Sequence, residues 1–181
     1  MEKLILGVLG EKFAGKDAVA NYLVEKHGAD HFRFSHILDD ILKLLNLPVS
    51  RGNEIALGLG LREIFGRQVL APAIVKRVQE SKRSLVVVNG LRMDEVAEIQ
   101  KIGGKIVYVT APAELRFERY QKRHEKADDG SMDYIQFVGQ EQSVTEVDIP
   151  VLGQQADFKI ENTGTLEELY QKTENILEAL K

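Results

Sequence analysis

The sequence predicts an α/β fold in which a central five-stranded parallel sheet carries helices on both faces. Short, continuous apolar runs suit strands that are covered on both sides. Segments with apolar residues at three- and four-residue spacing separate these runs, and strands that alternate with helices pair in parallel. The expected strands cover residues 4–10, 32–34, 85–88, 105–109 and, with a weaker pattern, 157–160.

Helix signals fill the gaps between the expected strands. Gly103 and Gly104 end a helix just before the fourth strand, and Pro112 stands where the next helix can begin. Thr165 and Glu168 form the capping-box pattern that opens the last helix. Apolar side chains recur at helical spacing over 18–26 and 37–45. The least regular stretches are short enough to be loops of one domain, and they cover 47–53, 127–131 and 143–155.

Length and composition predict a single domain over 1–181. A chain of this size buries roughly 70% of its unfolded surface, and 44% hydrophobic residues with 4 prolines are typical of a folded core. The net charge is -4, from 24 Lys and Arg against 28 Asp and Glu, so neither nucleic acid nor an anionic membrane is an expected partner. The first apolar run is too short to span a bilayer. The absence of cysteine excludes disulfides and thiolate metal sites, and the expected location is cytoplasmic.

A glycine-rich loop follows the first expected strand. Residues 10–17 read Gly-Glu-Lys-Phe-Ala-Gly-Lys-Asp, which matches the phosphate-binding pattern G-x-x-x-x-G-K-S/T except at its last place. Glycines let backbone N–H groups turn inward around phosphate oxygens, and the helix N-terminus adds partial positive charge. The residues expected to bind a nucleotide here are Gly10, Ala14, Gly15, Lys16, Asp17 and Ala18. The alternative is that the glycines only shape a tight turn between a strand and a helix.

Asp17 replaces the hydroxyl residue that usually ligates Mg²⁺ in such a loop. A carboxylate is a hard oxygen ligand, so we expect Asp17 to hold Mg²⁺ directly or through water. Asn89, which follows the third expected strand, can hydrogen-bond a metal-bound water but adds no charge. The metal site is therefore expected to depend mainly on Asp17. The alternative is that Asp17 is only favoured by the dipole of the helix that it opens.

Arginines stand near the ends of other strands. Arg92 could bind a substrate phosphate with two parallel hydrogen bonds, or it could be an exposed helix residue beside a turn. Arg116, Arg119 and Arg123 recur at helical spacing, so that one helix face would present all three. They could close over a transferring phosphoryl group, or they could form a solvated face.

A second basic set lies within the segment 35–82, which is predicted to be mostly helical. Its members are Arg51, Arg62, Arg67, Lys76 and Arg77. This segment would lie opposite the glycine-rich loop and would suit an acceptor site. Arg51 lies beside Pro48 and Gly52 and is expected in a loop.

Together these features resemble the P-loop kinases of the nucleoside-monophosphate kinase and dephospho-coenzyme A kinase group. Within that group they resemble most the adenylate-kinase-like archaeal proteins and the deoxynucleoside-monophosphate kinases of phages. The resemblance covers nearly the whole chain and includes 10–17, 35–45, 62–66, 88–95, 116–123 and 156–164. It implies a three-layer P-loop kinase fold with an acceptor-binding segment at about 35–82 and a short helical lid at about 112–142. It also implies that Asn162, Thr163 and Gly164 line an adenine pocket, with Arg119 on its other side.

The resemblance also bears on the acceptor. Dephospho-coenzyme A kinases, which phosphorylate a hydroxyl, resemble one another in an acidic residue at the end of the second strand, where this sequence reads Phe34-Ser35. A hydroxyl acceptor must lose a proton, whereas a monophosphate is already ionised and mainly needs arginines. A phosphate acceptor is therefore favoured, unless Asp39 or Asp40 supplies the base. Members commonly have aspartate where Asn89 stands, which implies lower metal affinity or turnover here.

The expected function is an ATP- and Mg²⁺-dependent kinase that transfers the γ-phosphoryl group to a nucleoside or deoxynucleoside monophosphate. The residues expected to act in catalysis are Lys16, Arg92, Arg119 and Arg123. Those expected to bind the acceptor are Ser35, Arg51, Arg62 and Arg92. One alternative is a dephospho-coenzyme A kinase-like hydroxyl kinase. The other is a nucleotide-binding switch or slow ATPase without a small-molecule acceptor.

Overall fold

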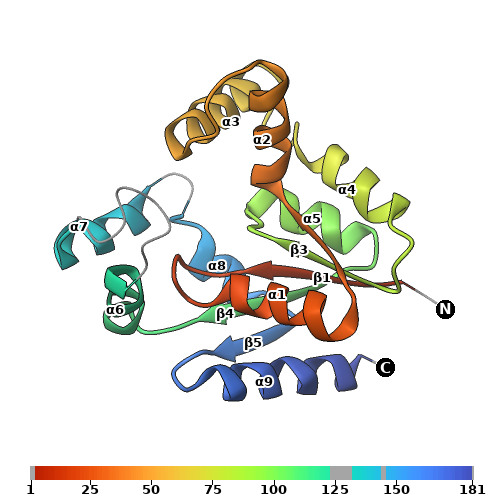
Figure 1. Ribbon diagram of the computed structural model, residues 1–181, viewed down its shortest axis with the longest axis vertical. Helices are drawn as coiled ribbons and strands as arrows, with labels where there is room; N and C mark the ends of the chain where they lie inside the picture. Colours follow the sequence, from red (N-terminus) through yellow and green to blue (C-terminus); the bar gives the residue numbers. More distant parts are fainter. Residues whose placement is uncertain (1–2, 123–131, 144–145, 181) are drawn as a thin grey trace.

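Five parallel strands form one sheet in the computed structural model, which describes residues 3–122, 132–143 and 146–180 (Figure 1). The strand order is β2-β3-β1-β4-β5. The strands are β1 (Leu4–Leu9), β2 (Asp30–Arg33), β3 (Leu85–Asn89), β4 (Lys105–Thr110) and β5 (Phe158–Glu161). β1 lies in the centre, where Leu4 pairs with Leu85 of β3 and Leu6 pairs with Lys105 of β4. The predicted parallel sheet is confirmed.

Helices cover both faces of the sheet. α1 and α9 pack on one face, and α2, α4, α5 and α8 contribute to the apolar cluster on the other. The helices are α1 (Lys16–His27), α2 (Phe34–Leu44), α3 (Arg51–Phe65), α4 (Ala71–Glu80), α5 (Met93–Lys101), α6 (Ala113–Lys122), α7 (Tyr134–Gly139), α8 (Ile149–Gln154) and α9 (Leu166–Ala179). A short 3-10 turn, Gln140–Gln142, follows α7. None of the helices in the described residues has the length and hydrophobicity needed to cross a bilayer.

The two-sided core explains why the strands read as continuous apolar runs. Along β1, Ile5 and Leu9 belong to the cluster under α2, α4, α5 and α8, while Leu6 and Val8 belong to the cluster under α1 and α9. Successive side chains of a strand point to opposite faces, so both sets must be apolar. All five residues of β3 are buried for the same reason.

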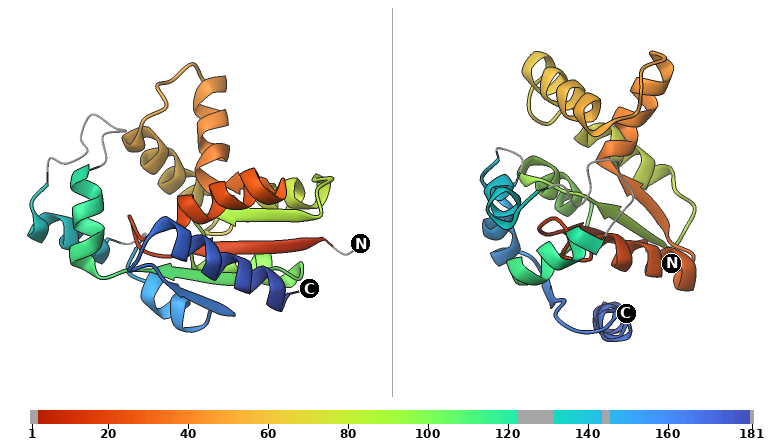
Figure 2. Two further views of the ribbon diagram at one scale, coloured as in Figure 1. Left: turned by 60° about the horizontal axis from the view of Figure 1, so that its bottom comes forward. Right: turned by 60° about the vertical axis from the view of Figure 1, so that its left-hand side comes forward.

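Two helical pairs frame the end of the sheet where the site lies. The strand arrows point away from both termini, toward the side where α6 and α7 lie (Figure 1). The pair α2 and α3 projects from the sheet at a different place, and both views in Figure 2 separate it from α6 and α7. The carboxyl ends of parallel strands are where α/β folds bind ligands. A ligand site is therefore expected at the carboxyl ends of the strands, between the two helical pairs.

Three boundaries differ from the sequence-based expectation. Phe34 does not end β2 but begins α2, where its ring is buried in the core. The segment 47–53, expected as a loop, contains the start of α3 at Arg51, because the Ser50 hydroxyl accepts a hydrogen bond from the Asn53 N–H at 3.3 Å and caps the helix. The segment 143–155 contains α8. The third expected loop, 127–131, lies outside the described residues.

Gly10 is expected to tolerate alanine less than Gly28 does, although both have positive φ. Gly10 has φ 149°, and a Cβ there would meet the backbone carbonyl oxygen of Val109 in β4. Gly28 has φ 63° and open space around it. Gly10→Ala should lower the free energy of unfolding by about 3 kcal/mol, and Gly28→Ala by about 1 kcal/mol. Urea unfolding of both variants measures this difference, and equal losses would contradict the packing described here.

Candidate active site

The loop between β1 and α1 has the backbone shape of a phosphate cradle. Positive φ values at Gly10, Phe13 and Gly15 curve the backbone of this loop. α1 begins at Lys16, and no side chain caps its first amides. Uncapped N–H groups at a helix N-terminus attract anions. The structure therefore leaves this helix end suited to phosphate.

Asn162, which follows β5, supports the same loop from behind. Its side chain is buried, and Nδ2 donates a hydrogen bond to the Ala14 carbonyl oxygen at 2.8 Å. A Cβ on Gly15 would meet that amide group. The carbonyl oxygen of Asn162 in turn accepts a hydrogen bond from Arg119 Nη2 at 2.8 Å. The loop is thus fixed by contacts with the far end of the chain.

Lys16, the first residue of α1, is a half-buried cation. Its Nζ donates a hydrogen bond to the Glu11 carbonyl oxygen at 2.7 Å. Burial, and secondarily the nearby Arg92 guanidinium, lowers the pKa of Lys16 to about 8, although the carboxylates of Asp17, Glu146 and Glu11 act in the opposite direction. Lys16 therefore stays charged at neutral pH but loses its proton more easily than an exposed lysine.

Asp17 joins α1 to two strand ends. Its Oδ1 accepts hydrogen bonds from Arg33 Nη2, at the end of β2, and from Asn89 Nδ2, at the end of β3, both at 2.7 Å. Asn89 is only 3% exposed, and its Oδ1 is buried with no hydrogen-bond partner among the described residues. A buried acceptor of this kind suits a hydrogen bond from bound water.

This polar set fits Mg²⁺ held largely through water. Asp17 supplies the negative charge, and Asn89 Oδ1 can accept a hydrogen bond from a water ligand of the metal. The described part of the chain contains no group of three His, Cys, Asp or Glu residues that could hold a metal ion. A magnesium ion here would take its other ligands from phosphate oxygens and water, as Mg²⁺ commonly does.

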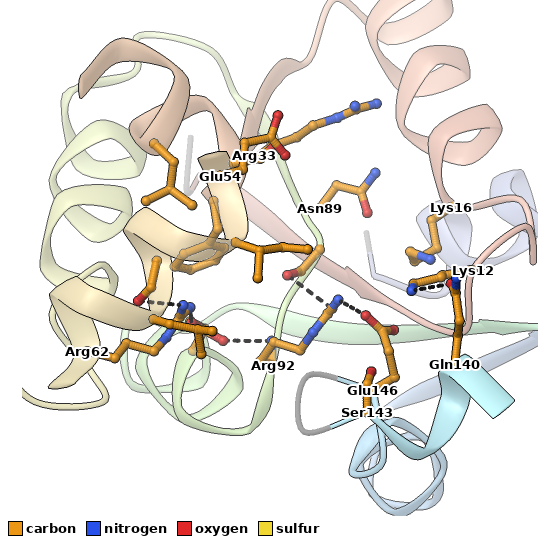
Figure 3. Close-up of a pocket in the computed structure, with 18 of the residues that line it drawn as sticks. Lys12, Lys16, Arg33, Glu54, Arg62, Asn89, Arg92, Gln140, Ser143 and Glu146 are labelled. Atoms are coloured by element: carbon orange, nitrogen blue, oxygen red, sulfur yellow. Dashed lines mark hydrogen bonds and ion pairs between the residues drawn. The ribbon is translucent and has the colours of Figure 1, made fainter. Parts of the chain in front are cut away.

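Two cavities meet at Lys16, Asp17 and Arg33, which line both. The smaller cavity, of about 360 Å³, lies over the glycine-rich loop and is also lined by Phe13, Gly15, Asn21 and Arg119. The larger, of about 730 Å³, lies between that loop and the α2–α3 pair (Figure 3). Its other lining residues are Lys12, Phe34, Ser35, Leu38, Glu54, Ile55, Gly58, Leu59, Arg62, Asn89, Gly90, Arg92, Glu95, Gln140, Ser143 and Glu146.

The larger cavity has both apolar and charged lining. Phe34 and Leu38 of α2 and Ile55 and Leu59 of α3 supply apolar lining. Two of its arginines are paired with carboxylates: Arg62 with Glu95 at 3.0 Å and Arg92 with Glu146 at 2.8 Å (Figure 3). Lys12, from the glycine-rich loop, donates a hydrogen bond to Gln140 Oε1 at 3.1 Å. Such a cavity suits a ligand with a flat apolar part and an anionic part.

Three of the four predicted acceptor residues line this cavity. Ser35, Arg62 and Arg92 do so, and Arg51 is the first residue of α3, with a side chain outside what the structure describes. The other basic residues of the segment 35–82 do not line it. Arg77 pairs with Asp40 at 2.7 Å, and Lys76 pairs with Glu80 at 3.8 Å.

The prediction that one helix face presents Arg116, Arg119 and Arg123 is wrong for Arg116. Its guanidinium is buried, where Nε donates a hydrogen bond to the Ala111 carbonyl oxygen at 2.8 Å and Nη1 pairs with Glu141. Arg119 turns instead to the glycine-rich loop and lines the smaller cavity. Arg123 lies outside the described residues.

Several residues predicted to bind the nucleotide lie behind the cavities rather than on their walls. Gly10, Ala14 and Ala18 shape the loop and the first turn of α1 without lining either cavity. Asn162 supports the loop, and Gly164 lies in the turn before α9, where a Cβ would meet the Glu168 carboxylate. Contact of these residues with a nucleotide stays a prediction.

Sequence reasoning missed other residues that the structure brings into the larger cavity. Arg33 was predicted to lie in a strand, but no motif marked it as a residue of the site. Glu54 and Glu146 carry no motif. Lys12 occupies a variable position of the glycine-rich loop, and its charge next to that motif was the one available signal.

No known family model matches the chain. Its fold is that of the P-loop kinases, because solved kinase structures align over nearly its whole length. Shikimate kinase from Acinetobacter baumannii has a TM-score of 0.58 and 18% identity, with 99% of this chain and 95% of that chain covered. A gluconokinase from Sinorhizobium meliloti has a TM-score of 0.60 and 15% identity, with 98% and 93% covered. Dephospho-CoA kinase from Campylobacter jejuni has a TM-score of 0.56 and 16% identity, with 99% and 98% covered.

Archaeal relatives share more of the sequence. A UPF0200 protein of Methanothermobacter thermautotrophicus is 27% identical over 184 residues, which cover 99% of this chain and 92% of the relative. A UPF0200 protein of Sulfurisphaera tokodaii is 27% identical over 180 residues, which cover 97% of each. The matched regions thus span most of both relatives as well as nearly all of this chain.

We expect ATP binding to take up a proton above the pKa of Lys16. In the protein without ligand, Lys16 has a pKa of about 8, and bound phosphates would raise that pKa. At about pH 9 the Lys16 amine is therefore mostly neutral before ATP binds and charged afterwards. Affinity for ATP should therefore fall as the pH rises past 8. Calorimetry at about pH 9 in two buffers of different ionisation enthalpy measures the uptake. The Lys16→Arg variant should show none, and equal uptake in both proteins would contradict the assignment.

Proposed function

We propose that this protein is an ATP- and Mg²⁺-dependent phosphotransferase whose acceptor is a nucleoside or deoxynucleoside monophosphate. The observation that carries the proposal is a cavity beside the glycine-rich loop into which Arg33, Arg62 and Arg92 all bring positive charge. Arg33 stands at the carboxyl end of β2, the region where the dephospho-coenzyme A kinases that the sequence resembles carry an acidic residue. A cation there suits an acceptor that is already an anion.

The smaller cavity would take the phosphates of ATP and the larger one the acceptor. Lys16 and the first amides of α1 would hold the outer phosphates of the nucleotide. Arg119 would lie against the nucleotide on the side away from the acceptor, since it lines only the smaller cavity. Because Lys16 lines both cavities, its charge would face the phosphoryl group throughout transfer and stabilise the charge that spreads over the oxygens.

The apolar lining of the larger cavity supports a nucleotide-like acceptor. A base would pack between Phe34 and Leu38 of α2 and Ile55 and Leu59 of α3, and its phosphate would point to the arginines. Arginine binds phosphate with two parallel hydrogen bonds, which fixes orientation as well as charge. Positioning of two anions by fixed cations accounts for most of what phosphoryl transfer requires of a protein.

Mg²⁺ would neutralise negative charge on the phosphate oxygens when bound. Asp17 and Asn89 would hold it through its water ligands. Arg33 Nη2 donates to the same Asp17 oxygen, so it limits how far that carboxylate moves.

The two aspartates considered as bases for a hydroxyl acceptor lie away from the cavities. Asp40 is bound to Arg77 at 2.7 Å, and neither Asp39 nor Asp40 lines either cavity. A dephospho-coenzyme A kinase-like reaction would therefore have to use another carboxylate, such as Glu54, which lines the larger cavity.

The proposal predicts a diphosphate product from one nucleoside monophosphate. The protein is incubated with Mg²⁺-ATP and, separately, each common ribo- and deoxyribonucleoside monophosphate and dephospho-coenzyme A, and products are followed by phosphorus NMR. Lys16→Ala should reduce transfer by at least about 100-fold and leave the thermal unfolding midpoint nearly unchanged. Phosphorylated dephospho-coenzyme A would contradict the proposal and direct attention to Glu54 as the base. Slow phosphate release that no acceptor accelerates would instead support a nucleotide-dependent switch.

Asp17 is expected to set the Mg²⁺ requirement. Asp17→Asn removes the carboxylate charge that is proposed to hold the metal, so the Mg²⁺ concentration for half-maximal activity should rise about tenfold. Asp17→Thr restores the hydroxyl that is usual at this place of the motif, and it should require less Mg²⁺ than the asparagine variant. Activity is measured against Mg²⁺ at saturating ATP. An unchanged requirement in Asp17→Asn would remove Asp17 from the metal site.

A further inference from the structure

We infer that Glu95 is a positioning residue that holds Arg62 and Arg92 together as one phosphate-binding pair. The inference rests on the proposed function, because the phosphate in question is that of the acceptor. One carboxylate oxygen of Glu95 contacts the Arg62 guanidinium, and the other contacts the backbone N–H of Arg92. No motif of the chain marks this role.

Glu95 uses both oxygens for this task. Its Oε1 accepts a hydrogen bond from Arg62 Nη2 at 3.0 Å, and its Oε2 accepts one from the Arg92 backbone N–H at 2.8 Å. The residue is only 3% exposed. A buried carboxylate is stable only when its oxygens are paired, so Glu95 restricts both partners as strongly as they restrict it.

The two contacts connect separate elements. Arg62 belongs to α3, in the pair that projects from the sheet, whereas Arg92 caps the N-terminus of α5 on the sheet itself. Arg62 also donates a hydrogen bond from Nη1 to the Gly58 carbonyl oxygen at 3.3 Å, within its own helix. Glu95 is therefore the contact that fixes the Arg62 guanidinium relative to the β3 end of the site.

Both guanidinium groups line the larger cavity, so the pair presents its charge to the acceptor (Figure 3). Arg92 Nη1 donates to the Leu91 carbonyl oxygen at 3.1 Å and Nη2 to Glu146 Oε1 at 2.8 Å. Donors that are fixed before binding lose less conformational freedom on binding, which raises affinity. A phosphate would meet two cations already in place.

Whereas Glu95 helps to position the arginine pair, Glu146 competes with phosphate for Arg92. Its carboxylate occupies an Arg92 donor that a phosphate would use, and it is nearly buried. An incoming phosphate must replace it. Glu95 and Glu146 carry equal charge and both contact Arg92, so the variants Glu95→Gln and Glu146→Gln form a matched pair with opposite expected effects.

The test is binding of inorganic phosphate to protein saturated with Mg²⁺-ADP, which occupies the glycine-rich loop. Arginine side-chain NMR signals report the binding, and variants at Arg62 and Arg92 assign them. Glu95→Gln should weaken phosphate binding about tenfold, while Glu146→Gln should strengthen it. Glutamine at this place of α5 still accepts the Arg92 N–H, so the helix cap is kept. If the glutamine variant does not fold, Glu95→Asp serves, because its shorter carboxylate cannot hold both partners and should also weaken binding.

A double-mutant cycle separates positioning from a general structural effect. If Glu95 acts through Arg62, then Arg62→Ala and the double variant Arg62→Ala with Glu95→Gln should bind phosphate within about twofold of each other. With the active monophosphate, Glu95→Gln should raise the acceptor KM about tenfold, change kcat less than about threefold and leave the ATP KM unchanged.

Wild-type phosphate affinity in Glu95→Gln, or additive losses in the double variant, would overturn the inference. Loss of phosphate binding in Glu95→Gln, in a protein that transfers phosphate to no monophosphate, would support the inference and refute the proposed function. The two failures are therefore distinguishable.

Discussion

The carboxylate of Asp17 is the point at which the glycine-rich loop, β2 and β3 are joined. One of its oxygens accepts hydrogen bonds from Arg33 and Asn89, and those two side chains start from neighbouring strand ends. A hydroxyl at this place could not balance the charge of Arg33. Asp17, the unusual residue of the motif, and Arg33, at the end of β2, therefore form one ion pair. Both residues line both cavities, so this pair lies where the cavities meet.

Electrostatic balance governs the rest of the site. Each of the three arginines that line the larger cavity has a carboxylate partner: Asp17 for Arg33, Glu95 for Arg62 and Glu146 for Arg92. The three partners differ in exposure, since Asp17 is 48% exposed at its side chain whereas Glu95 is 3% and Glu146 is 8% exposed. Exposed pairs exchange partners at little cost. The Arg33–Asp17 pair is therefore the most adaptable of the three.

The sequence was sufficient for the sheet and the loop because both depend on local signals. Apolar runs predicted the strands, and the spacing of Gly10, Gly15 and Lys16 predicted the loop. The charged cavity could not be predicted in the same way, because arginine spacing does not tell which guanidinium finds a buried carbonyl. Arg116 donates to the buried Ala111 carbonyl oxygen and lines neither cavity, whereas Arg33, at the end of a predicted strand, lines both. The contact between Asn162 and the loop joins opposite ends of the chain, so no window of sequence contains it.

The central position of β1 has a consequence for how the molecule folds. Leu4 pairs with Leu85 and Leu6 with Lys105, so the two strands that pair with β1 lie far along the chain. Contacts between distant residues form late, because closing long loops costs entropy before any pairing is gained. During synthesis the loop is made before β3 and β4, so we expect it to take its final shape only after those strands have been made. The phosphate cradle thus stands early in the sequence, but we expect it to form late in folding.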